Sequence, residues 1–340
     1  MNIFQILSEL EKVDPEVYER FDSRRRVFKH ISGLGKNLAA AAVPLAFTAI
    51  FNKAYGQTST SAPSATDVLA FALKLEYLES YFYNAGLGAP GATATAAQTT
   101  FRNLFSATNL SSLDKIRLDE SNHVKALVAA LPANTVPVPA TNIFDFTGGK
   151  GSNAGPFAGV FVNPAIFLAV AQSLEDTGVR AYKGGAPYLM STTTAGRSIL
   201  ETALNIHSVE ARHASRLRTM RRAGASNNTA SAVAPTAGNN ESDRSASPKS
   251  WVSFKDGGGA SPAQTAGIYG AGTSPSYTPA SITFPAEDNV TQGGVNLQSA
   301  LASLNFPASA FSEAFDEPLP VPTVLSIAST FTVTGNTFFG

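Results

Sequence analysis

The sequence predicts an all-α protein: a four-helix bundle in which one long crossover joins two helix pairs, followed by an irregular C-terminal extension. Three observations support this prediction. Four segments between residues 64 and 224 carry apolar residues at helical spacing. Residues 132–162, which are rich in Pro, Gly, Asn and Thr, separate the second segment from the third. Residues 225–340 are rich in Ser, Asn and Gly and show no sustained helical period.

The first helix is predicted over residues 66–86. Thr66 or Asp67 can cap its start, and Gly86 can end it. Leu69 begins a series of apolar residues that recur at helical intervals along this segment. One face of the helix is therefore expected to be buried.

The second helix is predicted over residues 111–131. Ser111 and Asp114 have the spacing of a capping box, and Pro132 closes the segment. We expect residues 96–107 to add no more than a turn or two of helix before it. The link between the first two helices is therefore short.

The third helix is predicted to begin at Asn163–Pro164, because proline is favoured at the first helical position, and to stop at Gly184–Gly185. Gly178, inside this helix, lowers its intrinsic helix propensity. The fourth helix is predicted over residues 194–222, with Gly224 as its C-terminal signal.

The bulk composition excludes several classes of function. The chain of 340 residues carries 25 basic and 25 acidic side chains, so its net charge does not suggest a nucleic-acid partner or an anionic membrane surface. It has no cysteine, which excludes disulfides, thiolate metal sites and cysteine nucleophiles. Any metal ion must therefore be bound by nitrogen and oxygen atoms.

A pattern of glutamate and histidine repeats in the two helix pairs. The first helix of each pair carries a glutamate followed seven residues later by a tyrosine, and the second carries Glu-x-x-His. Both spacings place the two side chains on one helix face. Carboxylate-bridged di-metal bundles use one Glu from each of two helices and a Glu-x-x-His from each of the other two. The predicted metal ligands are Glu76, Glu120, His123, Glu175, Glu210 and His213.

The residue types explain the chemistry. A single Glu-x-x-His is more often a solvated pair than a ligand pair, but two of them in this order are much harder to obtain by chance. Four carboxylates can neutralise two divalent cations, and each imidazole adds one nitrogen ligand. Oxygen-rich sites with some nitrogen suit manganese or iron, although copper or zinc could also bind. We therefore predict two Mn or Fe ions as cofactors.

The residues next to the predicted ligands have several possible roles. Glu79 could replace or join Glu76. Tyr83 and Tyr182 could hydrogen-bond the ligands, serve as redox-active tyrosines or pack, and packing is the preferred interpretation. Asp119 and Glu201 are expected at the surface or beside the ligands, and His207 is expected to be structural.

The same segments resemble a known family. The stretches A-L-K-L-E-Y-L-E-S-Y-F-Y, D-E-S-N-H-V-K-A-L, Q-S-L-E-D-T-G-V-R-A-Y and S-V-E-A-R-H-A-S-R-L-R are similar to the ferritin-like superfamily, and more narrowly to its desiccation-related ferritin-like domain family. The tail shares F-P-A-E-D-N-V-T-Q-G-G-V and E-A-F-D-E-P-L with that family. The resemblance implies a four-helix bundle and export, and it defines no activity.

The chain is divided into three predicted parts. Residues 1–57 resemble a twin-arginine export signal, because Arg24–Lys29 precede a short apolar run. This predicts a periplasmic or extracellular protein; the alternative is a leader that is retained. Residues 64–224 form the bundle. Residues 225–340 are predicted to be a linker followed by an extended segment that wraps the bundle or a neighbouring subunit of a homodimer or larger assembly.

Two functions remain open at this point. The first is an exported stress-protection enzyme that consumes peroxide or dioxygen, with a catalase-like di-manganese or ferroxidase-like activity. Its partners are metal ions and a small oxidant. The second is a structural or stress-protective bundle, or an assembly component, in which the metal site is vestigial or only stabilises the fold.

Overall fold

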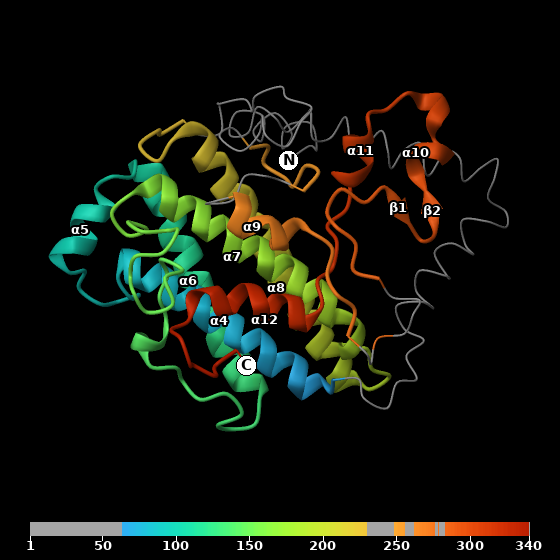
Figure 1. Ribbon diagram of the computed structural model, residues 1–340. Coiled ribbons are helices and arrows are strands. Elements are labelled where there is room, and N and C mark those ends of the chain that lie inside the picture. Colours follow the sequence, from blue (N-terminus) through green and yellow to red (C-terminus); the bar gives the residue numbers. More distant parts are fainter. Residues whose placement is uncertain (1–62, 230–247, 256–261, 276–277, 279–282, 340) are drawn as a thin grey trace, which may run out of the picture.

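The computed structural model describes residues 63–229, 248–255, 262–275, 278 and 283–339. The predicted export leader, residues 1–57, lies outside these residues, so export stays a prediction. In the described part, four long helices lie side by side as a bundle (Figure 1). They are α4 (Ala65–Leu87), α6 (Ala107–Ala130), α7 (Pro164–Gly185) and α8 (Thr194–Ala223).

The ends of three of these helices follow local capping rules. Ser64 caps α4 in a capping box with Asp67. The Asn163 side chain accepts a hydrogen bond from Ala165 N at the start of α7, and Pro164 is its first residue. Helix α8 ends at Gly224, whose φ of 91° lies in the region that favours glycine. The sequence indicated these boundaries to within a residue or two.

The start of α6 was predicted wrongly. The helix begins at Ala107, where Ser106 accepts a hydrogen bond from the Asn109 backbone, so Ser111 is not its cap. Asp114 lies inside the helix and forms a two-pronged ion pair with Arg102, at 2.8 Å for each contact. Arg102 ends a separate short helix, α5 (Ala96–Arg102). The Asp114 side chain, which was predicted to take part in a capping box, therefore forms a tertiary contact instead.

The long crossover between α6 and α7 is ordered by a buried carboxylate. Asp145 is 2% exposed and accepts hydrogen bonds from the backbone N–H groups of Thr147, Gly151 and Asn153. The same crossover contains a single 3₁₀ turn, η1 (Thr141–Ile143). Three aromatic residues of the crossover, Phe144, Phe146 and Phe157, belong to the main hydrophobic core. The same core contains residues of the four long helices, among them Phe82, Leu113, Phe167 and Leu217.

Two helices of the C-terminal extension lie against the bundle. Helix α12 (Val321–Ala328) packs on α4 and α7, and α9 (Pro262–Tyr269) packs on α7 (Figure 1). Gly184 shows how closely the tail approaches, because a Cβ atom there would lie 1.9 Å from the Leu319 carbonyl oxygen. The remaining elements are short: η2 (Ala186–Leu189), β1 (Thr291–Gln292), β2 (Val295–Asn296), α10 (Leu297–Ala300), η5 (Ala302–Leu304), α11 (Ala308–Ser312) and η6 (Ser329–Phe331).

One arginine holds three parts of the tail on the bundle. Arg180, on α7, is 2% exposed and forms an ion pair with Glu287 at 2.9 Å. Its guanidinium also donates to five backbone carbonyls of the tail, those of Ile268, Gly270, Pro285, Glu317 and Pro318. All the donor groups of this buried cation are thereby engaged, which removes much of the cost of its burial.

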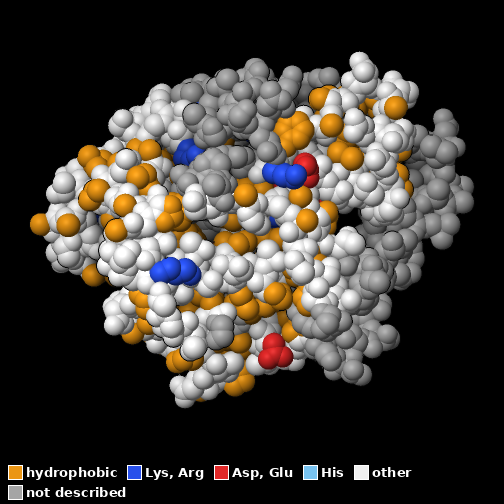
Figure 2. Space-filling model, viewed as in Figure 1, with side chains coloured by type: hydrophobic (Ala, Val, Ile, Leu, Met, Phe, Trp, Pro, Cys, Tyr) orange, Lys and Arg blue, Asp and Glu red, His pale blue; other side chains and the backbone are white. Residues whose placement is uncertain are grey.

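The face shown in Figure 2 carries few charged side chains, in keeping with the low charged fraction of 15%. Hydrophobic side chains, other uncharged side chains and the backbone make up most of the described surface on this side. Among the described residues, no helix combines the length and the apolar character that crossing a membrane requires.

The Arg180 contacts lead to a stability prediction. We expect Arg180→Met to lower the free energy of unfolding by about 3–5 kcal/mol, because it removes the cation that pairs with Glu287 and the donors of five carbonyls. Urea denaturation measures this loss, and limited proteolysis should show faster cleavage of the tail. Arg197→Met, at an exposed position of α8, is the matched control and should change the stability little. Equal stabilities for the two variants would contradict the proposed clamp.

Candidate metal centre

The centre of the bundle contains one fully buried glutamate from each long helix. Glu76, Glu120, Glu175 and Glu210 are each 0% exposed. All four point inward because their helices present them on the same face as core residues such as Leu113. Four carboxylates at 0% exposure would be very costly to keep ionised without partners.

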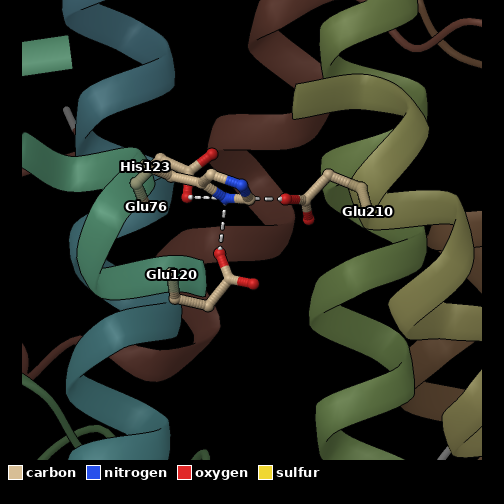
Figure 3. A group of neighbouring side chains, drawn as sticks. All are labelled: Glu76, Glu120, His123 and Glu210. Carbon is tan, nitrogen blue, oxygen red and sulfur yellow. Dashed lines mark hydrogen bonds and ion pairs between the residues drawn. The ribbon is translucent and has the colours of Figure 1, made fainter. Parts of the chain in front are cut away.

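The first group of ligands surrounds His123. Its Nδ1 atom lies 3.2 Å from Glu76 Oε2, 3.0 Å from Glu120 Oε2 and 3.3 Å from Glu210 Oε1. Figure 3 shows the imidazole ring between these carboxylates, which come from α4, α6 and α8. Three helices therefore converge on one nitrogen atom.

The second group surrounds His213 in the same way. Its Nδ1 atom lies 2.8 Å from Glu120 Oε1 and 3.1 Å from Glu175 Oε2. The rings of His123 and His213 are stacked, with their centroids 6.2 Å apart. The structure thus brings all six of the predicted ligand residues together.

The two groups share two carboxylates. Glu76, Glu120, His123 and Glu210 can each offer one atom such that all four atoms lie within 4.8 Å of one another, and Glu120, Glu175, Glu210 and His213 form a second such set. Glu120 and Glu210 belong to both sets, so each could bridge two ions. These buried clusters are compatible with a pair of bound metal ions.

Two tyrosines cross the bundle to reach the glutamates. The Tyr83 hydroxyl of α4 donates to Glu175 Oε1 of α7 at 2.6 Å, and the Tyr182 hydroxyl of α7 donates to Glu76 Oε1 of α4 at 2.5 Å. The expectation that these side chains mainly pack was therefore incomplete. Burial raises the pKa of both phenols well above the usual value, which keeps the hydroxyl protons in place for these hydrogen bonds.

Glu79 joins the cluster as a fifth carboxylate, at 3% exposure. It lies opposite Gly178 of α7: a Cβ atom built on that glycine would be 2.7 Å from Glu210 Oε2 and 3.3 Å from Glu79 Oε1. The glycine that weakens the predicted helix thus leaves room for two carboxylates. The sequence hinted at Glu79 only through its spacing from Glu76.

Burial and the neighbouring charged groups shift the pKa values of the side chains in the cluster. Burial raises the pKa of Glu76 to about 7 and raises that of Glu210 well above its usual value. Burial acts on Glu120 in the same direction, but hydrogen bonds from His123 and His213 prevail and hold its pKa at about 2. Burial would lower the pKa of His213, yet the charge of Glu175 and the hydrogen bond to Glu120 raise it to about 12. The same balance raises the pKa of His123.

Residues next to the ligands were only partly anticipated. Asp119 is half-buried and lies with Oδ2 3.2 Å from His213 Nε2, so it contacts a predicted ligand. Glu201 is exposed, as expected. His207 Nδ1 lies 3.0 Å from the Val179 carbonyl, which fits its expected structural role.

Orphaned oxygen atoms show that the residues present suit a cation. Glu210 Oε2 is buried with neither a hydrogen-bond partner nor an imidazole beside it. Two further buried oxygens have only an imidazole nitrogen beside them: Glu120 Oε1 is 2.8 Å from His213 Nδ1, and Glu210 Oε1 is 3.3 Å from His123 Nδ1. A cation would satisfy these lone pairs with the oxygen and nitrogen donors that manganese and iron accept.

The tight space at Gly178 can be tested. A Gly→Ala change inside a helix normally gains about 1 kcal/mol of stability. Because a Cβ atom at Gly178 would meet two carboxylates, we expect Gly178→Ala to lose about 1–3 kcal/mol instead. Gly267→Ala in α9 is the control, because its Cβ would have its nearest contact at 3.9 Å, with Ile327. Urea denaturation compares the two, and equal gains would mean that the carboxylates do not fill this space.

Comparisons with known proteins agree with this geometry. The model of the ferritin-like domain family matches residues 64–223, which span the four long helices and every candidate ligand. No curated protein and no solved structure matches the chain. The narrower, desiccation-related assignment stays a prediction. The helical bundle and its single long crossover agree with this match, and residues 64–223 are therefore similar to the ferritin-like domain family in both sequence and fold.

Proposed function

We propose that the centre binds two manganese or iron ions and that the protein uses them to consume peroxide or dioxygen. The observation that carries this proposal is the presence of two four-residue ligand sets that share Glu120 and Glu210. Peroxide removal is the most concrete version, because one peroxide molecule is oxidised to dioxygen while another is reduced to water, so that no external reductant is needed. Ferrous iron oxidation by dioxygen is the close second. A desiccation-related, stress-protective role is part of this proposal.

The residues of the chain have separate tasks in this reaction. Bound manganese or iron would supply and take back the electrons. The buried carboxylates provide the negative charge that balances two divalent cations, and Tyr83 and Tyr182 fix the orientation of Glu175 and Glu76 through their hydrogen bonds. The side chain of His123 is 11% exposed whereas the four glutamates are fully buried, so we place the entry of the small oxidant beside His123.

The shared carboxylates provide the direct test. We expect the double variant Glu120→Ala, Glu210→Ala to lose both ions, because each ion position needs both side chains. Elemental analysis after loading with manganese or iron measures binding, and oxygen evolution from peroxide measures activity. Glu201→Ala, an exposed position on α8, is the control and should behave as the wild type. A wild-type protein that takes up neither metal would refute the proposal.

Metal uptake should depend on pH. The pKa of His213 is raised to about 12 and that of His123 is also raised. At neutral pH and without a bound ion, both rings are therefore imidazolium cations with a proton on each nitrogen. An incoming ion must displace these protons, and the affinity therefore rises with pH. Calorimetric titration in buffers of different ionisation enthalpy should detect proton release, and the affinity should be higher at about pH 8 than at about pH 6. Binding without proton release would contradict the assignment of both histidines as ligands.

The second candidate function is a protective or structural bundle with a site that does not turn over. One observation favours it: imidazole–carboxylate contacts of about 3 Å join all four helices directly. The same double variant separates the two candidates. If the biological role persists after loss of both ions, with the fold intact by circular dichroism, the structural function is favoured over the redox function.

A further inference from the structure

The two halves of the metal centre are close to equivalent. Each ligand on α4 and α6 has a counterpart at the same spacing on α7 and α8: Glu76 with Glu175, Glu120 with Glu210 and His123 with His213. The tyrosines follow the same rule, because each donates to the glutamate of the other helix. Departures from this equivalence show where the two ion positions differ.

The clearest departure lies one residue before the shared glutamates. On α6 this residue is Asp119, and on α8 it is Val209. Both positions are half-buried, so they occupy similar places on their helices. Of the two side chains, only that of Asp119 can accept a hydrogen bond.

Asp119 reaches the outer nitrogen of the opposite histidine. Its Oδ2 atom lies 3.2 Å from His213 Nε2, while His213 Nδ1 faces Glu120 and Glu175 inside the centre. Lys115, one turn earlier on α6, contacts Oδ1 of the same carboxylate. The carboxylate is therefore held from one side and accepts the Nε2–H of His213 on the other. Once a cation displaces the proton on Nδ1, this contact would keep the remaining proton on Nε2 and leave the Nδ1 lone pair directed into the centre.

His123 lacks the equivalent support. Its Nδ1 atom faces Glu76, Glu120 and Glu210, but within the described parts of the chain no acceptor lies within hydrogen-bond distance of its Nε2 atom. Val209, at the position that corresponds to Asp119, offers no acceptor. The His123 ring is also the more exposed of the two, at 11% against 7%.

We propose that Asp119 makes the two ion positions unequal, so that the position at His213 binds its ion more tightly and fills before the position at His123. Asp119 is a positioning residue that acts through His213. A carboxylate that accepts the outer N–H of a metal-binding imidazole orients the ring and raises its basicity, and its loss typically lowers metal affinity about 10- to 100-fold. The proposal rests on the proposed metal binding and adds the order of loading.

The test is a calorimetric titration of the metal-free full-length protein with Mn²⁺, repeated with Co²⁺ for its visible absorption. The wild type should show two binding steps of different affinity. Asp119→Asn should weaken only the tighter step, about 10-fold, and Asp119→Leu should weaken it further. Each change should alter the cobalt spectrum of the first ion bound and leave that of the other ion unchanged. A merely structural role would not produce this graded effect on one step.

Two further variants complete the design. Val209→Asp supplies the missing acceptor and should tighten the weaker step. Asp114→Asn, which removes a carboxylate that pairs with Arg102 on the same helix, is the control and should leave both steps unchanged. If Asp119→Asn does not fold, Val209→Asp alone decides the question.

The outcomes distinguish the two proposals. Two ions bound with equal affinity, or an Asp119→Asn variant that weakens both steps alike, would overturn the unequal positions while leaving metal binding intact. No uptake of Mn²⁺ or Co²⁺ by the wild type would overturn the metal centre itself, and the order of loading with it.

Discussion

The structure depends on the burial of five carboxylates in the middle of a helical bundle. Ionised side chains are expensive to remove from water, and the bundle offsets this cost with two imidazoles and two phenol hydroxyls that all point to the same place. Each partner comes from a different helix than the glutamate it serves, apart from the contact of His123 with Glu120 within α6. The charges therefore fix how the four helices pack, because sliding one helix by a turn would leave a carboxylate without its partner.

A second layer of buried charge lies directly outside the first. Asp176, next to Glu175 on α7, forms an ion pair with Arg218 of α8 and accepts a hydrogen bond from Tyr269 of the tail. Arg180, one turn further along α7, holds the remaining tail segments. The face of α7 that turns away from the metal centre is thus tied to the extension. These tail segments are therefore part of the same packed structure as the ligand helices.

The sequence was most informative where the relevant contacts are local. Glu-x-x-His and Glu-x₆-Tyr spacings lie within one or two helical turns, so the regular helix geometry already places those side chains on one face. The cap of α6 was missed because Ser106 and Ser111 are equally good caps in isolation, and the choice depends on the pairing of Asp114 with Arg102. The tyrosine hydrogen bonds could not be separated from packing, because both require the same buried position.

The Arg180 contacts lie beyond any local pattern. Five of its acceptors are backbone carbonyls, which every residue has, and they lie between 88 and 138 residues further along the chain. Composition can indicate that such a tail is ordered but not where it docks. The requirement for glycine at position 184 could not be predicted from the sequence for the same reason. It arises only because the backbone of Leu319 passes too close to leave room for a side chain.

The arrangement around Arg180 also affects the order in which the protein can be completed during synthesis. The ribosome produces α7 well before Glu287 and the carbonyls up to Pro318. Until those residues emerge, the guanidinium has no acceptors in the tail and must stay in contact with water. The face of α7 that holds the arginine therefore remains open on the nascent chain, and the bundle reaches its final packing only after the residues up to Pro318 have been synthesised.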